Sequence, residues 1–166
     1  MPTEHMKTER LLELVQSFDV AMLTTTSLSG NLRARPMAVA DVDADGTIWL
    51  VTGHESAKTD EIAADAEVGL TMQGKASFVS ITATAQVQTD PAKVAEVWSE
   101  PMRVWFPDGP ESPEIRLIRV RPIRGEYWDV RGTNAASFIW ESLKAYAQGE
   151  RVDDDAETNG HGTVQL

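Results

Sequence analysis

Two short groups of residues combine positive charge with hydrogen-bond donors, the chemistry that holds a phosphate. The first is residues 33–37 (RARPM), where alternation along an extended strand puts Arg33 and Arg35 on one face. The second is residues 52–58 (TGHESAK), which span the end of a strand and the expected start of a helix. A helix N-terminus presents unpaired N–H groups that attract anions, and the Ser56 hydroxyl and the Lys58 ammonium add further donors. An arginine on a neighbouring strand can grip the same anion with two hydrogen bonds.

Each group also has a simpler interpretation. A strand arginine taken alone more often belongs to a surface ion pair, and a serine before a helix more often only caps it. We expect the two groups to meet because they lie on adjacent hairpin strands, which antiparallel pairing brings together. The residues by themselves therefore indicate a phosphate-ligand site.

The periodicity of apolar residues predicts the elements that position these groups. We expect a helix over residues 3–17, a short helix between Gly53 and Ala66, and another that starts at Asp90-Pro91. Strands are expected over 19–26, 33–42, 47–52, 68–72, 78–89 and 115–129, with turns at 29–31 and 45–46, an ordered loop over 101–113 and a last helix over 135–148. Many closely spaced strands with few helices predict a mainly β (α+β) fold, an antiparallel barrel with flanking helices.

The chain has neither an internal repeat nor a linker, so we expect one domain over residues 1–150 and an acidic, disordered tail over 151–166. A formal net charge of -11 argues against nucleic acid and acidic membrane surfaces as partners. The sequence contains no cysteine, and its first 18 residues carry charges without an apolar run. We therefore expect a cytoplasmic protein without signal peptide or membrane span.

Other kinds of site find little support in the residues. The three histidines are far apart in the sequence, so no metal site is expected. Glycine-rich nucleotide signatures and a nucleophile elbow are also missing from the sequence. No residue stands out as a general acid or base, and we nominate no catalytic residue.

Three segments in this order, residues 35–37, 49–52 and 56–58, resemble the FMN-binding region of pyridoxamine 5'-phosphate oxidase-like split barrels. Residues 97–98, 105–109 and 126–129 are similar to the general stress protein branch of that family. The resemblance covers about residues 11–130. It implies an antiparallel split β-barrel that works as a homodimer, with FMN at the dimer interface and each flavin site using both chains.

The resemblance also implies roles for single residues. Arg35 and Lys58 would hold the FMN phosphate, and Ser56 would assist them. The remaining candidates would lie along the ribityl chain and the ring edge, or cover the ring from the partner subunit, where aromatic faces stack on a flat heterocycle. The first set is Pro36, Met37, Val51 and Thr52, and the second is Trp105, Phe106 and Trp128.

The chain departs from the true oxidase at three points. Ala57 replaces one of two basic residues before the helix, Ala40 replaces a strand lysine, and the C-terminal Arg-x-His substrate motif has no counterpart. We therefore expect an FMN-dependent oxidoreductase with a stress-related role that does not oxidise pyridoxamine phosphate. A reduced nicotinamide is one candidate electron donor, although no motif for it can be read.

Two alternatives remain open from the sequence. The protein could be a non-catalytic stress protein that binds FMN to store, sense or sequester it, as the missing substrate motif suggests. The barrel could also hold a deazaflavin or haem in place of FMN. Haem would need an axial ligand, and His54 is the histidine best placed to supply it.

Overall fold

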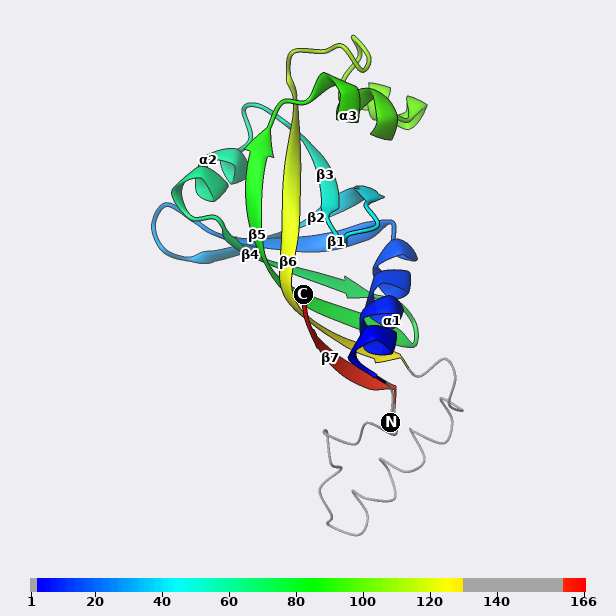
Figure 1. The fold of residues 1–166 in the computed structure, drawn as a ribbon. Helices are drawn as coiled ribbons and strands as arrows, with labels where there is room; N and C mark the ends of the chain where they lie inside the picture. The colour runs from blue at the N-terminus through cyan, green and yellow to red at the C-terminus, as the bar shows by residue number, and fades with distance from the viewer. Residues whose placement is uncertain (1–2, 130–159) are drawn as a thin grey trace.

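The protein is mainly β, and six of its strands close into a barrel with helices packed around it (Figure 1). The coordinates are a computed structural model that describes residues 3–129 and 160–166. This architecture confirms the expected antiparallel split β-barrel with flanking helices. The helices are α1 Glu4–Gln16, α2 Ala57–Ala64, α3 Pro91–Val97 and the 3-10 helix η1 Glu100–Val104. The strands are β1 Val20–Thr26, β2 Leu32–Val42, β3 Ile48–Gly53, β4 Glu67–Gln73, β5 Ser77–Gln88, β6 Ile115–Asp129 and β7 His161–Gln165.

The long strand β6 closes the barrel and also extends it. The sheet runs in the order β3-β2-β1-β4-β5-β6-β7, and β6 returns to pair with β3. All the pairings are antiparallel. The first part of β6, from Ile115 to Val120, pairs with β3, whereas Arg124 to Trp128 pair with β7. One strand of 15 residues thus serves two neighbours at its two ends.

The barrel opens where β2 and β3 stop pairing, and this opening makes room for a ligand. Their last paired residues are Val39 and Leu50, next to a register shift in β2. Beyond that point β2 pairs with β1, so that Arg35 lies opposite Leu23, while Thr52 pairs with β6. The two segments that carry the basic groups are therefore separated by a gap instead of a continuous hairpin.

The core of the barrel consists of inward-facing side chains, because every second residue of a strand faces the interior. Strand β5 alternates buried and exposed residues over its first ten positions, as an antiparallel strand with one wet face should. Leu23, Leu50 and Leu70 are fully buried. Each such side chain contributes roughly 1.5–3 kcal/mol to folding.

Helix α1 covers one end of the barrel with its apolar stripe. The Thr3 side chain caps the helix by accepting a hydrogen bond from the Met6 backbone, and Leu11, Leu14 and Val15 are buried. The helix packs so closely on β6 that a Cβ atom at Gly125 would lie 2.3 Å from a Leu11 methyl carbon. The predicted helix over residues 3–17 is confirmed.

The two turns read from the sequence are also present. Gly30 and Gly46 have φ angles of +87° and +86°, which glycine adopts without a steric cost. Gly46 donates its backbone hydrogen bond to the Asp43 carbonyl in the turn between β2 and β3.

The end of the chain corrects one expectation. Residues 151–166 were expected to form a disordered tail, but His161–Gln165 form β7, which pairs with β6 and buries Val164 completely. A segment of five residues is too short to be predicted as a strand from its sequence pattern. It forms a strand because it pairs with the free edge of β6. The expected helix over residues 135–148 lies outside the described residues.

A smaller apolar cluster sits where α3 and η1 meet the barrel, at the upper end in Figure 1. It contains Trp49, Val94, Phe106, Ile115 and Leu117. Through Phe106, the cluster anchors the segment that follows η1 beside the open end of the barrel. Within residues 3–129 and 160–166, no helix has the length and apolar character needed to cross a bilayer. The expected cytoplasmic location stays a prediction.

Candidate functional site

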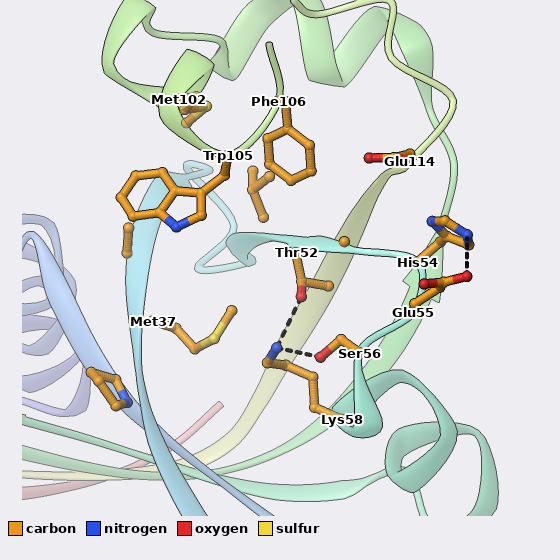
Figure 2. Close-up of a pocket in the computed structure, with 14 residues that line it drawn as sticks. Met37, Thr52, His54, Glu55, Ser56, Lys58, Met102, Trp105, Phe106 and Glu114 are labelled. Atoms are coloured by element: carbon orange, nitrogen blue, oxygen red, sulfur yellow. Dashed lines mark hydrogen bonds and ion pairs between the residues drawn. The ribbon is translucent and has the colours of Figure 1, made fainter. Parts of the chain in front are cut away.

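A cavity of about 580 Å³ lies in the gap between β2 and β3, and it collects most of the predicted site residues. Its size falls within the range of small-molecule sites. Its walls come from β2, β3, the start of α2, the segment after η1 and the approach to β6 (Figure 2). The cavity is lined by Pro36, Met37, Ala38, Val51, Thr52, Gly53, His54, Glu55, Ser56, Lys58, Met102, Trp105, Phe106 and Glu114.

The start of α2 presents polar donors to this cavity. Ser56 precedes the helix in an extended conformation, but its side chain forms no capping hydrogen bond. Instead its hydroxyl accepts a hydrogen bond from the Lys58 ammonium, which also donates to the Thr52 hydroxyl at 3.0 Å. Figure 2 shows these three side chains converging at the floor of the cavity. A hydroxyl that does not cap its helix stays available to a ligand.

Lys58 is a cation that has no carboxylate partner among the described residues. In the part of the chain that the structure describes, its ammonium forms hydrogen bonds to hydroxyl groups and no ion pair. Burial lowers the pKa of Lys58, the positive charge of Arg35 lowers it further, and Glu61 only partly offsets both. The positive charge of this lysine is thus poorly compensated by the protein. A partly buried cation in this state is typical of a site that binds an anion.

Arg35 lies next to the cavity but does not line it. Its guanidinium donates to the Thr25 hydroxyl at 2.5 Å and to the Glu61 carboxylate at 2.8 Å. Arg33, on the same face of β2, donates to the other oxygen of Glu61 at 2.6 Å. The prediction that the two arginines share a face is confirmed. Arg35 is also near enough to Lys58 for its positive charge to lower the pKa of that lysine.

Glu61 is the residue of this region that the sequence did not reveal. Only 2% of its surface is exposed. A hydrogen bond from Thr25 lowers the pKa of Glu61, and so do the hydrogen bond from Arg35 and the charges of both arginines, although burial opposes them. In the sequence it is one more glutamate of a helix, a residue usually found in water. The one available signal was its position three residues after Lys58, on the same helix face.

The opposite wall of the cavity is apolar. Figure 2 shows Trp105 and Phe106 across the cavity from Met37 and Lys58. Phe106 and Met37 are nearly buried, whereas Trp105 is 72% exposed although it lines the cavity. Such an exposed tryptophan can swing over a flat ligand or meet a second molecule.

A third part of the rim is acidic and carries His54. The His54 backbone donates to the Glu114 carbonyl at 2.8 Å, and its ring lies 3.6 Å from the Glu55 carboxylate. His54, which the sequence singled out as the histidine best placed to be an axial ligand, does line the cavity. Glu55 lies within the second basic group but was given no role, and Glu114 and Met102 were not identified, because each is an ordinary loop or helix residue without a local pattern.

Trp128 is the predicted site residue that lies elsewhere. It sits near the far end of β6, opposite Phe78 of β5. Its ring stacks on His161 of β7, with 5.0 Å between the centroids and 12° between the planes. Trp128 does not line the cavity of its own chain, so its role as a cover for a partner's ligand stays a prediction.

Comparison with known proteins supports a relationship over most of the chain. The family model described as pyridoxamine 5'-phosphate oxidase like matches residues 6–153. The fold is similar to a putative general stress protein 26 from Jannaschia sp. CCS1, with a TM-score of 0.72 and 23% identity over 96% of this chain and 98% of the other. It is also similar to the general stress FMN/FAD binding protein from Xanthomonas citri, with a TM-score of 0.65 and 25% identity over 76% and 90%.

A curated relative is the Protein bli-3 of Neurospora crassa, which is 29% identical over 133 residues. The match covers 73% of this chain. This chain spans only 64% of the length of that relative, less than two thirds.

Proposed function

The chain belongs to the pyridoxamine 5'-phosphate oxidase-like family, and from this membership we propose that it is an FMN-binding flavoprotein that works as an oxidoreductase. The observation that carries the proposal is the Lys58 ammonium, which faces the cavity without a carboxylate partner among the described residues. An anionic group is the missing counterpart of that charge.

The residues of the cavity fit a flavin with a terminal phosphate. Lys58 and Ser56 would hold the phosphate, with Thr52 beside them. Met37 and the Trp105–Phe106 wall would enclose the ring between apolar surfaces. A bound flavin supplies hydride and electron transfer, while these residues bind it, orient it and keep water from the ring.

The local charge favours a phosphate monoester. Near the start of α2, Arg33, Arg35 and Lys58 carry positive charge and the carboxylate of Glu61 opposes it, whereas Glu55 and Glu114 lie on another part of the cavity lining. A phosphate monoester carries about −1.5 to −2 charges at pH 7, whereas a phosphodiester carries about one. A phosphate monoester such as that of FMN would therefore suit the positive charge beside Lys58.

The first experiment is the visible spectrum of the purified protein and the identification of any chromophore released on denaturation. We expect a flavin spectrum and release of FMN. Titration of the flavin-free protein with FMN and with riboflavin then measures what the phosphate contributes. Equal dissociation constants for the two flavins would contradict a phosphate site, and the absence of any flavin binding would contradict the function as a whole.

Turnover separates an oxidoreductase from a protein that only stores or senses FMN. The assay follows oxidation of a reduced nicotinamide with several electron acceptors. We expect reduction of the bound flavin by the nicotinamide. FMN that stays oxidised under these conditions would support the sequestration alternative instead.

We further propose that the protein is a homodimer with shared flavin sites. The outer face of β1 exposes Val20 and Met22, which are 53% and 38% exposed. Their neighbours in register are Ala38 and Pro36 of β2 and Thr71 of β4, so this face is uncharged in a strongly charged protein. Pro36 also lines the cavity, which makes the face continuous with the proposed site. A second copy is the occupant that would bury this face and reach the flavin at the same time.

Sedimentation of a charged variant tests the dimer. Met22→Glu should shift the protein to monomer and weaken FMN binding, because it places a charge in the proposed interface. Met6→Glu is the matched control, since Met6 is 54% exposed on α1. A wild-type monomer that retains FMN, or a Met22→Glu variant that stays dimeric, would contradict shared sites.

A further inference from the structure

The buried carboxylate of Glu61 lies behind the proposed phosphate site and does not line the cavity. Its two oxygens have separate partners. One accepts hydrogen bonds from Arg35 at 2.8 Å and from the Thr25 hydroxyl at 2.5 Å, and the other accepts from Arg33 at 2.6 Å. A single side chain of α2 thus connects the helix that carries Lys58 to the two strands β1 and β2.

This arrangement fixes the guanidinium of Arg35. One of its terminal nitrogens donates to Thr25 and the other donates to Glu61, and Thr25 in turn donates to Glu61. The three groups form a closed ring of hydrogen bonds in which only 19% of the Arg35 side chain is exposed. Charge-assisted hydrogen bonds of this kind hold a planar guanidinium in one orientation.

Glu61 forms ion pairs with Arg33 and Arg35 and not with Lys58. The two residues are three positions apart on α2, a spacing at which helix side chains readily pair. The Lys58 ammonium nevertheless binds only the Ser56 and Thr52 hydroxyls among the described residues. At Lys58, moreover, the charge of Arg35 outweighs that of Glu61.

We propose that Glu61 is a positioning residue of the flavin phosphate site, which acts through Arg35 by holding that guanidinium beside Lys58. The inference rests on the proposed FMN function and assigns a role to a residue that does not line the cavity. The carboxylate sets the geometry of the positive groups, and Lys58 and Ser56 meet the phosphate.

Two other roles would leave different signatures. A carboxylate that only braced the fold would, when changed, weaken the binding of every flavin alike. A carboxylate that acted only by its charge would oppose the phosphate, so its neutralisation would tighten FMN binding. The positioning role predicts instead a loss that is confined to ligands with a phosphate.

The experiment measures dissociation constants of FMN and riboflavin for two variants by quenching of flavin fluorescence. Glu61→Asp keeps the charge and moves the carboxylate by one methylene, and Glu61→Gln keeps the shape and removes the charge. In both variants we expect FMN affinity to fall about tenfold, as residues that support a ligand-binding group commonly show. Riboflavin affinity should stay at the wild-type value, and urea unfolding of both variants shows whether they are folded.

A double substitution shows whether Glu61 acts through Arg35. Arg35→Met should itself lower FMN affinity, and Arg35→Met/Glu61→Gln should lower it no further, because the group to be positioned is gone. Tighter FMN binding by Glu61→Gln, unchanged FMN binding by Glu61→Asp, equal losses for both flavins, or additive losses in the double variant would each overturn the proposal. A wild-type protein that binds neither flavin would instead refute the proposed function itself.

Discussion

Lys58 and Lys93 both extend from the first turn of a short helix, yet their surroundings are opposite. Lys93 of α3 forms ion pairs with Asp41 at 2.7 Å, Asp43 at 2.9 Å and Glu96 at 3.1 Å. Its ammonium also lies 5.2 Å from the centre of the Trp49 ring. Within residues 3–129 and 160–166, Lys58 has no such partner.

The difference appears in the pKa of each lysine. Burial alone would lower the pKa of Lys93, but the hydrogen bonds with Asp41, Asp43 and Glu96 outweigh it and raise that pKa above its ordinary value. For Lys58, burial and the charge of Arg35 act in the same direction and lower the pKa. The fold therefore stabilises the charge of one lysine and penalises the charge of the other.

The comparison shows how to tell a structural lysine from a ligand-binding one. Lys93 already has more negative charge around it than it can neutralise, so it has little to offer an anionic ligand. Lys58 borders a cavity with its charge uncompensated, and a phosphate would supply what the protein does not.

Lys93→Met should destabilise the protein by about 2–4 kcal/mol, because it leaves three carboxylates without their shared cation. The lower part of that range allows for the partial exposure of Asp41 and Asp43, whose side chains are 35% and 37% exposed. Urea unfolding measures the loss. FMN affinity should not change. An unfolding free energy equal to that of wild type would contradict the structural role of Lys93.

Lys58→Met should do the reverse. FMN affinity should fall roughly 10- to 100-fold, the loss expected for one hydrogen bond to a charged group. The flavin-free protein should be as stable as wild type or more stable, because folding no longer buries an uncompensated charge. Lys75→Met, at an exposed position between β4 and β5, is the control. Destabilisation as large as that of Lys93→Met would show that Lys58 is structural too.

The affinity for FMN should depend on pH through Lys58. The phosphate binds the protonated ammonium, so affinity is full below the pKa of Lys58 in the free protein and falls as pH rises through it. Because that pKa is lowered, the decline should begin below the ordinary lysine value of 10.5, with a slope of at most about tenfold per pH unit. Lys58→Arg should bind FMN without this decline, since arginine stays charged. The same decline in Lys58→Arg would point to another group.

Glu61 should contribute acid-sensitive stability, the smallest of these effects. Its pKa is lowered from the ordinary value of 4.5, so its contribution is present above that pH and is lost as pH falls through the lower folded-state pKa. The difference in unfolding free energy between wild type and Glu61→Gln should therefore shrink as the pH decreases below 4.5. A difference that is constant between pH 6 and pH 3 would exclude this linkage.

Local patterns were enough to predict most of the elements. The alternation in β5, the glycines of two turns and the Asp90-Pro91 helix start each depend on residues close together in the chain. Asp90 does cap α3, with its carboxylate accepting a hydrogen bond from the Lys93 backbone at 3.0 Å. Ser56 and Lys58 at the start of α2 could also be predicted, because the start of a helix defines where its first side chains lie.

Neighbouring residues were enough to predict strands β1 to β6, the two turns and the two positive groups. Three features could not be predicted in this way: the ion pair of Arg35 with Glu61, the position of Trp128 away from the cavity, and the strand His161–Gln165. These outcomes depend on which distant segments share a barrel wall and in which register they pair. Contacts between distant segments produce no periodic pattern in the sequence, because they form only when the barrel closes.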